Sequence, residues 1–140
     1  MPRAPLALGL AGLIPFWGLA LALLVHGAFG LDPAVIDLAL ATYAAIIVSF
    51  LGGIRWGLAT RADDTAAAPY ALSVVPSLVA WAALAAHEPW RLAILGLVAL
   101  ALGPLDLGLV RSGAAPAWFG RLRLILSTGA GVALLLAAWG

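Results

Sequence analysis

The stretch LALGLAGLIPFWGLALALLV, Leu6–Val25, runs for 20 residues without a charged side chain. An α-helix rises about 1.5 Å per residue, so this segment would span about 30 Å, the thickness of the hydrocarbon core of a bilayer. A secretory signal peptide fits less well, because its apolar region usually covers only about 7–15 residues. We therefore interpret the segment as an uncleaved first transmembrane helix.

Further apolar segments follow, and together they fill most of the 140-residue chain. Pro, Gly, Asp and Arg cluster between them, as is typical of the ends of membrane helices. Asp32 is suited to cap the second helix and Pro33 to occupy its first turn, and residues 117–123 are expected to form an interfacial lead into the last helix. The sequence predicts an all-α fold, an integral membrane bundle of five transmembrane helices in a single domain, residues 1–140. The helices are expected at about residues 6–28, 34–60, 66–86, 90–110 and 121–139.

Composition excludes several classes of protein. With 65% hydrophobic and 9% charged residues and a mean hydropathy of +1.14, the chain is neither disordered nor a soluble globular domain. The absence of Cys excludes disulfides and thiolate metal sites. The arginines are scattered between helices rather than gathered into a patch, so we expect no nucleic-acid partner. Arginine in place of lysine, with abundant Ala, Leu and Gly, suggests a bacterial genome rich in G and C.

Arginine is distributed unequally between the two ends of the predicted helices. Positively charged residues favour the cytoplasmic side of a membrane, so we expect the N-terminus to be cytoplasmic and the C-terminus periplasmic, in the bacterial inner membrane. Only Arg91 lies on the predicted outer side. Trp56 and Trp118 are then expected in the inner aromatic belt, and Trp90 and Trp139 in the outer one. The residues on the predicted inner side are Arg3, Arg55, Arg61, Arg111, Arg121 and Arg123.

Arg55 and Asp106 are the sharpest candidates for a functional site, because each lies about one turn inside the predicted cytoplasmic boundary. A charged side chain in the membrane must face protein, water or a partner, since exposure to lipid costs about 2.5–3.5 kcal/mol at a helix centre. A salt bridge between the second and fourth helices would satisfy both residues. Alternatively, Arg55 binds an anionic headgroup or substrate that Asp106 orients, because guanidinium geometry suits carboxylate and phosphate.

Two tryptophans and three glycines complete the candidate set around this pair. Trp56 follows Arg55 directly, whereas Trp17 lies near the middle of the first helix, where its indole N–H needs a polar ligand group or a carbonyl freed by Pro15. Gly52, Gly53 and Gly57 would allow close packing of another helix or a flat ligand.

Proline interrupts the first, third and fourth predicted helices, and each proline frees a backbone carbonyl. Ser73 and Ser77 flank Pro76 and are expected to supply hydrogen-bond donors at the break in the third helix.

Other kinds of chemistry find no support in the sequence. His26, Asp37, His87 and Glu88 lack the compact spacing of a metal site. Serines and threonines have no context resembling a nucleophile elbow or a catalytic triad. We therefore predict no metal, no cofactor and no enzymatic activity.

Several segments together resemble a family of small bacterial inner-membrane proteins of unknown function that has mitochondrial transmembrane relatives. The segments are residues 10–16, 43–57, 73–78 and 116–123, and SFLGGIRWG at Ser49–Gly57 is the most specific of them. The resemblance implies a five-helix inner-membrane protein of an alphaproteobacterial or related type, without a known activity or cofactor.

Two functions remain open from the sequence. The leading one is a non-catalytic accessory or assembly subunit of a larger, energy-transducing inner-membrane complex, with membrane lipids and other subunits as partners. The alternative is a small transporter, or a lipid- or quinone-binding protein, with its site around Arg55 and Asp106.

Overall fold

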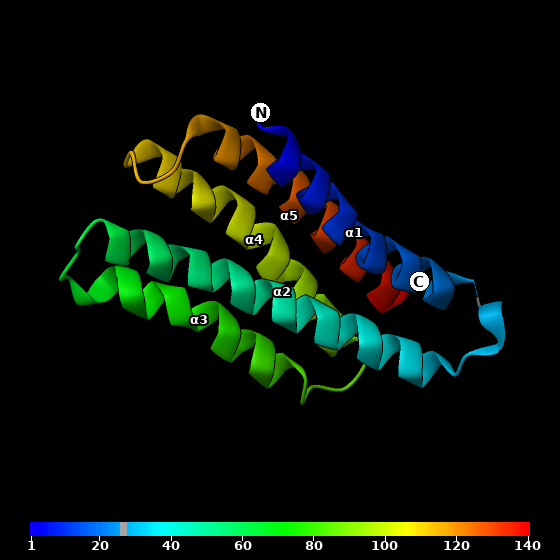
Figure 1. The fold of residues 1–140 in the computed structure, drawn as a ribbon. Coiled ribbons are helices and arrows are strands. Elements are labelled where there is room, and N and C mark those ends of the chain that lie inside the picture. The colour runs from blue at the N-terminus through cyan, green and yellow to red at the C-terminus, as the bar shows by residue number, and fades with distance from the viewer. Residues whose placement is uncertain (26–27) are drawn as a thin grey trace.

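The computed structural model describes residues 1–25 and 28–140, and this part of the chain forms an all-helical bundle (Figure 1). No β-strand occurs within these ranges. The all-α class predicted from the sequence is therefore confirmed. The elements are α1 (Arg3–Leu24), the short 3₁₀ turn η1 (Ala28–Gly30), α2 (Pro33–Arg61), α3 (Ala67–Ala83), α4 (Trp90–Arg111) and α5 (Ala117–Trp139).

Four of the described helices, α1, α2, α4 and α5, are long and apolar enough to cross a membrane. The exception is α3, which has 17 residues and a length of about 25 Å, at the lower limit for a span. It ends at Ala83 rather than near Ala86, because the residues that lead to Pro89 form turns.

The ends of α1 and α5 also differ from expectation. The first helix ends at Leu24, and Ala28 belongs to η1 instead; His26 and Gly27, within the predicted helix, lie outside the described residues. Helix α5 begins at Ala117, directly after Pro116, so residues 117–123 are helical rather than an interfacial lead. This places Arg123 in the second turn of a membrane helix. As predicted, Asp32 caps α2, accepting a hydrogen bond from the Ala34 N–H at 3.0 Å.

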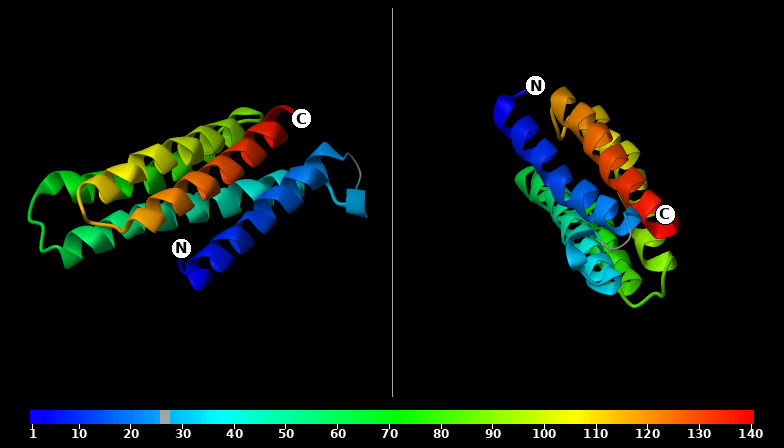
Figure 2. Two further views of the ribbon diagram at one scale, coloured as in Figure 1. Left: turned by 90° about the horizontal axis from the view of Figure 1, so that it is seen from above. Right: turned by 90° about the vertical axis from the view of Figure 1, so that its right-hand side faces the viewer.

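Four of the described helices, α1, α2, α4 and α5, form a ring, and α3 packs outside it. Helix α1 contacts α2 and α5, and α4 contacts the same two helices, so that α1, α2, α4 and α5 enclose a common interior (Figure 2). Helix α3 packs against α2 and α4 on the outside. The interior contains small residues that let helix backbones approach closely. Fully buried examples are Ala20, Ala41, Ala44 and Ala133.

Gly52 lies at a close approach of α2 and α3. It is buried, and a Cβ atom there would overlap the carbonyl oxygen of Ser73. Gly53 and Gly57, which the sequence also suggested as packing residues, are exposed and have open space where a Cβ atom would lie. Each residue turns about 100° around the helix axis, so only Gly52 faces α3.

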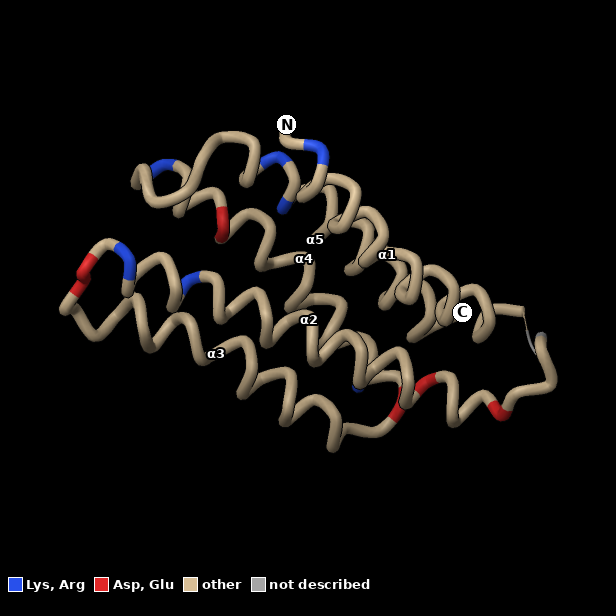
Figure 3. Tube along the Cα trace, in the orientation of Figure 1, with Lys and Arg blue, Asp and Glu red and all other residues tan. Residues whose placement is uncertain are grey.

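Charged residues gather at the two ends of the bundle (Figure 3). Most basic positions lie toward the end at which α1 begins, as expected from the sequence. At the other end, the rings of Trp90 and Trp139 meet edge to face with centroids 6.1 Å apart, so these two residues share one end of the molecule. There Arg91 binds Asp37 at 3.1 Å.

Candidate functional site

Arg55 and Asp106 form the ion pair that their common depth suggested. The Nε atom of Arg55 donates to Oδ1 of Asp106 at 3.1 Å, and Nη2 lies 3.0 Å from the same oxygen. Nη2 also donates to the carbonyl of Leu105 at 2.7 Å. The pair therefore joins α2 to α4, and both of the Arg55 nitrogens named here have partners within the protein.

A second arginine, Arg123, binds the other oxygen of the same carboxylate. Its Nε donates to Oδ2 of Asp106 at 2.7 Å. The sequence did not indicate this residue as a site candidate, because residue 123 was expected in an interfacial segment. One signal was available: Arg123, Ser127, Ala130 and Leu134 recur at three- and four-residue spacing, which puts them on one face of a helix.

The three side chains Arg55, Asp106 and Arg123, hereafter the charge cluster, carry one positive charge in excess when all are ionised. Asp106 is 2% exposed and Arg123 is 4% exposed, so both are shielded from water. Nη2 of Arg123 is buried and has no hydrogen-bond partner. An unpaired buried donor on a charged group costs roughly 1–3 kcal/mol or more. One donor of the charge cluster thus has no partner among the described protein atoms.

Ser127 lies one turn beyond Arg123 and repairs the break that Pro104 makes in α4. Its Oγ accepts from the Gly103 N–H at 3.0 Å, donates to the carbonyl of Ala99 and lies 3.3 Å from that of Leu100. Pro104 has no N–H to bond Leu100, so a hydroxyl from α5 replaces part of the helical bonding. The hydrogen bonds of the Ser127 hydroxyl are consequently used to hold the backbone of α4.

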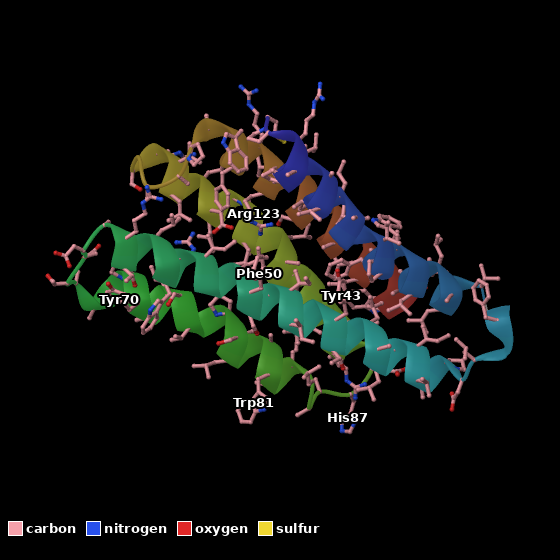
Figure 4. The ribbon with its side chains drawn as sticks, viewed as in Figure 1. Tyr43, Phe50, Tyr70, Trp81, His87 and Arg123 are labelled. Carbon is pink, nitrogen blue, oxygen red and sulfur yellow. The ribbon has the colours of Figure 1, made fainter. Side chains whose placement is uncertain are left out.

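An apolar cavity of about 400 Å³ lies beside Arg123, inside the ring of four helices. Its volume falls within the range of small-molecule sites, about 300–1,000 Å³. Arg123 is the only charged residue among its described lining residues, and Ser127 contributes the only hydroxyl. Apolar residues that line the cavity include Leu8 and Phe16 of α1, Ile47 and Phe50 of α2, and Leu126 and Leu134 of α5. Figure 4 shows Arg123 directed from α5 into the bundle, near Phe50.

The remaining candidates lie apart from this cavity. Trp56 is 49% exposed and meets Tyr70 edge to face, with centroids 4.9 Å apart. Trp17 packs against the apolar core and is not a lining residue of the cavity. The Tyr43 hydroxyl donates to the carbonyl of Gly12 at 2.8 Å, which is not the carbonyl that Pro15 leaves free, that of Ala11.

The serines beside Pro76 do not bond the carbonyl of Leu72, which is the one that this proline leaves free. Ser73 donates to Tyr70 and Ser77 to Val74, each three residues earlier. A serine hydroxyl reaches carbonyls of its own preceding turn most easily, which corrects the expectation that these serines repair the break.

A smaller cavity of about 210 Å³ lies between α2, α3 and α4, with Arg55 in its wall. The nitrogens of Arg55 named above already have partners, unlike Nη2 of Arg123. The larger cavity is therefore the stronger candidate. Within the described ranges, no group of three His, Asp or Glu side chains is placed to hold a metal ion.

Comparison with known proteins identifies the family. A family model described as "Protein of unknown function (DUF3429)" matches residues 1–139. This chain belongs to the DUF3429 family. Transmembrane protein 69 of Xenopus tropicalis is 38% identical over 131 residues, which cover 90% of this chain and 50% of that protein. The mouse protein of the same name is 34% identical over 128 residues, covering 89% of this chain and 51% of its own length.

This member of the DUF3429 family spans about half the length of the curated relatives that it matches. No solved structure matches the chain. The relatives are named as transmembrane proteins, and four described helices here are long and apolar enough to cross a bilayer. The protein is therefore a multi-pass integral membrane protein, and the resemblance to a family of unknown function with transmembrane relatives is confirmed.

Proposed function

We propose that this protein is a non-catalytic membrane protein that binds a membrane amphiphile, a lipid or a quinone, in the 400 Å³ cavity, with the polar headgroup of the amphiphile on Arg123. Two observations carry the proposal: Nη2 of the buried Arg123 guanidinium has no hydrogen-bond partner, and the Arg123 residue lines an apolar cavity. An amphiphile supplies what both parts lack, namely oxygen atoms for Arg123 and hydrocarbon for the cavity.

A purely structural role explains the charge cluster less well. One arginine is enough to neutralise Asp106 and to join two helices. Burying a second guanidinium adds a desolvation cost of several kcal/mol, which a shared carboxylate offsets only in part. Intramembrane charges that are not fully paired generally mark ligand or ion sites. The second arginine therefore favours binding over simple bracing.

The binding hypothesis from the sequence centred on Arg55 and Asp106, whereas this proposal assigns the ligand contact to Arg123. In this proposal Asp106 positions both arginines, and Arg55 anchors Asp106 to α2 through the bonds described above. Catalysis is not part of the proposal, since the hydroxyl that lines the cavity, that of Ser127, is held by the backbone of α4.

Location in a bacterial inner membrane, with the N-terminus in the cytoplasm, is part of the same proposal. The arginine distribution between the two ends of the bundle supports it. The accessory-subunit role stays a prediction from the sequence.

Native mass spectrometry after gentle extraction from the membrane tests the proposal. We expect wild-type protein to retain an amphiphile of defined mass, and Arg123→Gln to lose it. Arg121→Gln is the matched control, because Arg121 lies on the same helix but is exposed. Retention that is equal in all three proteins, or absent from wild type, would refute the proposal. Recovery of a stoichiometric protein partner without any retained amphiphile would favour the accessory-subunit role instead.

A further inference from the structure

Resting on the proposed function, we infer that the amphiphile is a single-chain lipid with one compact negative charge, chemically a long-chain carboxylate. The charge cluster, the sparse polar lining and the shape of the cavity each support this class. The inference excludes quinones, long-chain alcohols and diacyl phospholipids.

The charge of the cluster favours a monoanion. Two guanidinium groups and one carboxylate leave an excess of one positive charge among the three residues. A monoanion brings the site to neutrality. A quinone carbonyl or an alcohol accepts a hydrogen bond but leaves the excess positive charge of the cluster uncompensated. In a site shielded from water, hydrogen bonds between ionised partners are roughly twice as strong as neutral ones.

The lining of the cavity favours a compact headgroup. Among the described residues that line it, Arg123 alone is charged, and the hydroxyl of Ser127 is already bonded to α4. A glycerophosphate headgroup carries several ester and hydroxyl oxygens, which would be buried there without donors, at a cost for each. A carboxylate places both of its oxygens within reach of one guanidinium.

The shape of the cavity favours one chain that enters from the side. Along α5 the lining continues from Arg123 to Leu134, eleven residues or about 16 Å, with apolar walls on α1 and α2. Leu8 and Phe50 line the same cavity and are 75% and 64% exposed. On a membrane protein these exposed walls face lipid, so the opening lies between α1 and α2, where a hydrocarbon chain can enter from the bilayer.

The discriminating experiment compares ligands with different headgroups, two of which, palmitate and hexadecanol, share the same chain. Delipidated protein in detergent is titrated with palmitate, hexadecanol, a ubiquinone with a short isoprenoid tail and dioleoyl phosphatidylglycerol, and binding is followed by native mass spectrometry. We expect palmitate to bind at least about tenfold more tightly than hexadecanol, a difference of about 1.4 kcal/mol, because hydrogen bonds between ionised partners are roughly twice as strong as neutral ones. Arg123→Gln should abolish this preference, and Arg121→Gln should keep it.

A second pair of variants tests the cavity without altering a charge. Gly12 lines the cavity, and a Cβ atom there has only an ordinary contact, 3.8 Å from the Tyr43 hydroxyl. Gly12→Leu should therefore fill the cavity and weaken palmitate binding at least about tenfold. Gly18 lies on the same helix with open space around it, so Gly18→Leu should bind as wild type does. This pair decides the matter if Arg123→Gln fails to fold.

The outcomes separate the inference from the proposed function. Equal binding of palmitate and hexadecanol, or tighter binding of the quinone or the phospholipid, overturns the inference but leaves an amphiphile site in place. Failure of every ligand to bind, together with the absence of a retained amphiphile in the extracted protein, overturns both. Palmitate binding that Gly12→Leu does not weaken places the ligand elsewhere and also overturns both.

Discussion

At the scale of single residues, the decisive feature is that one carboxylate serves two arginines. One carboxylate oxygen of Asp106 accepts a hydrogen bond from Arg55, and the other accepts one from Arg123. The pairing with Arg55 could be predicted, because two opposite charges at equal depth in a membrane each need a partner. The role of Arg123 could not, because it depends on where α5 begins and on how that helix is rotated about its axis.

The shared carboxylate predicts an order of stability among variants. Asp106→Asn leaves the buried Arg123 and the partly exposed Arg55 without a counter-charge, and breaking a buried pair such as Arg123 with Asp106 costs about 3–5 kcal/mol. Arg123→Gln should cost less, since Asp106 keeps Arg55 and the excess charge disappears. Thermal unfolding in mild detergent should rank Arg121→Gln nearest to wild type, then Arg123→Gln, then Asp106→Asn. A lower melting temperature for Arg123→Gln than for Asp106→Asn would contradict this assignment of charges.

At the scale of helices, two contacts decide how the elements pack. The first is the close approach of α2 and α3 at Gly52, where a Cβ atom would overlap the carbonyl oxygen of Ser73. The sequence indicated that small residues matter near position 52, but not which of the three glycines faces a neighbour. Apolar residues surround α2 on all sides, because lipid and the protein interior are equally apolar, so the buried face cannot be identified by its hydrophobicity.

Gly52→Ala and Gly53→Ala therefore form a matched pair. Gly52→Ala should separate α2 from α3 and destabilise the protein by about 1–3 kcal/mol, as overpacking does. Gly53→Ala should be neutral or stabilising by up to about 1 kcal/mol, because its position is open and alanine has the higher helix propensity. Thermal melts of the two variants would show the difference, and a similar loss in both would mean that α3 packs elsewhere.

The second contact is the hydroxyl of Ser127 inserted beside the Pro104 break. Ser127→Ala should cost about 1–3 kcal/mol, since it leaves buried backbone groups of α4 unpaired. The loss should shrink in a Pro104→Ala background, where residue 104 regains the N–H that bonds Leu100. A double-mutant cycle on unfolding in detergent measures this coupling. Additive losses would show that the hydroxyl does not serve the break.

At the scale of the whole molecule, the ring of α1, α2, α4 and α5 encloses a cavity that opens toward the bilayer and has a positive charge on its wall. The number of helices and their approximate limits followed from the lengths of the apolar segments. The cavity could not be predicted, because it arises from how four uniformly apolar helices fit together around Gly and Ala residues. Only a three-dimensional arrangement shows that Arg123 faces this space.

Photolabelling tests the central claim, an amphiphile held beside Arg123, most directly. A long-chain carboxylate with a diazirine in its chain is added to the protein in lipid nanodiscs, and the sample is irradiated. The modified residues are then mapped by peptide mass spectrometry. We predict labels on the cavity faces of α1 and α5, within residues 8–16 and 122–134, and their loss in Gly12→Leu but not in Gly18→Leu. Labels spread evenly over the lipid-facing surface, or concentrated on α3, would contradict the claim.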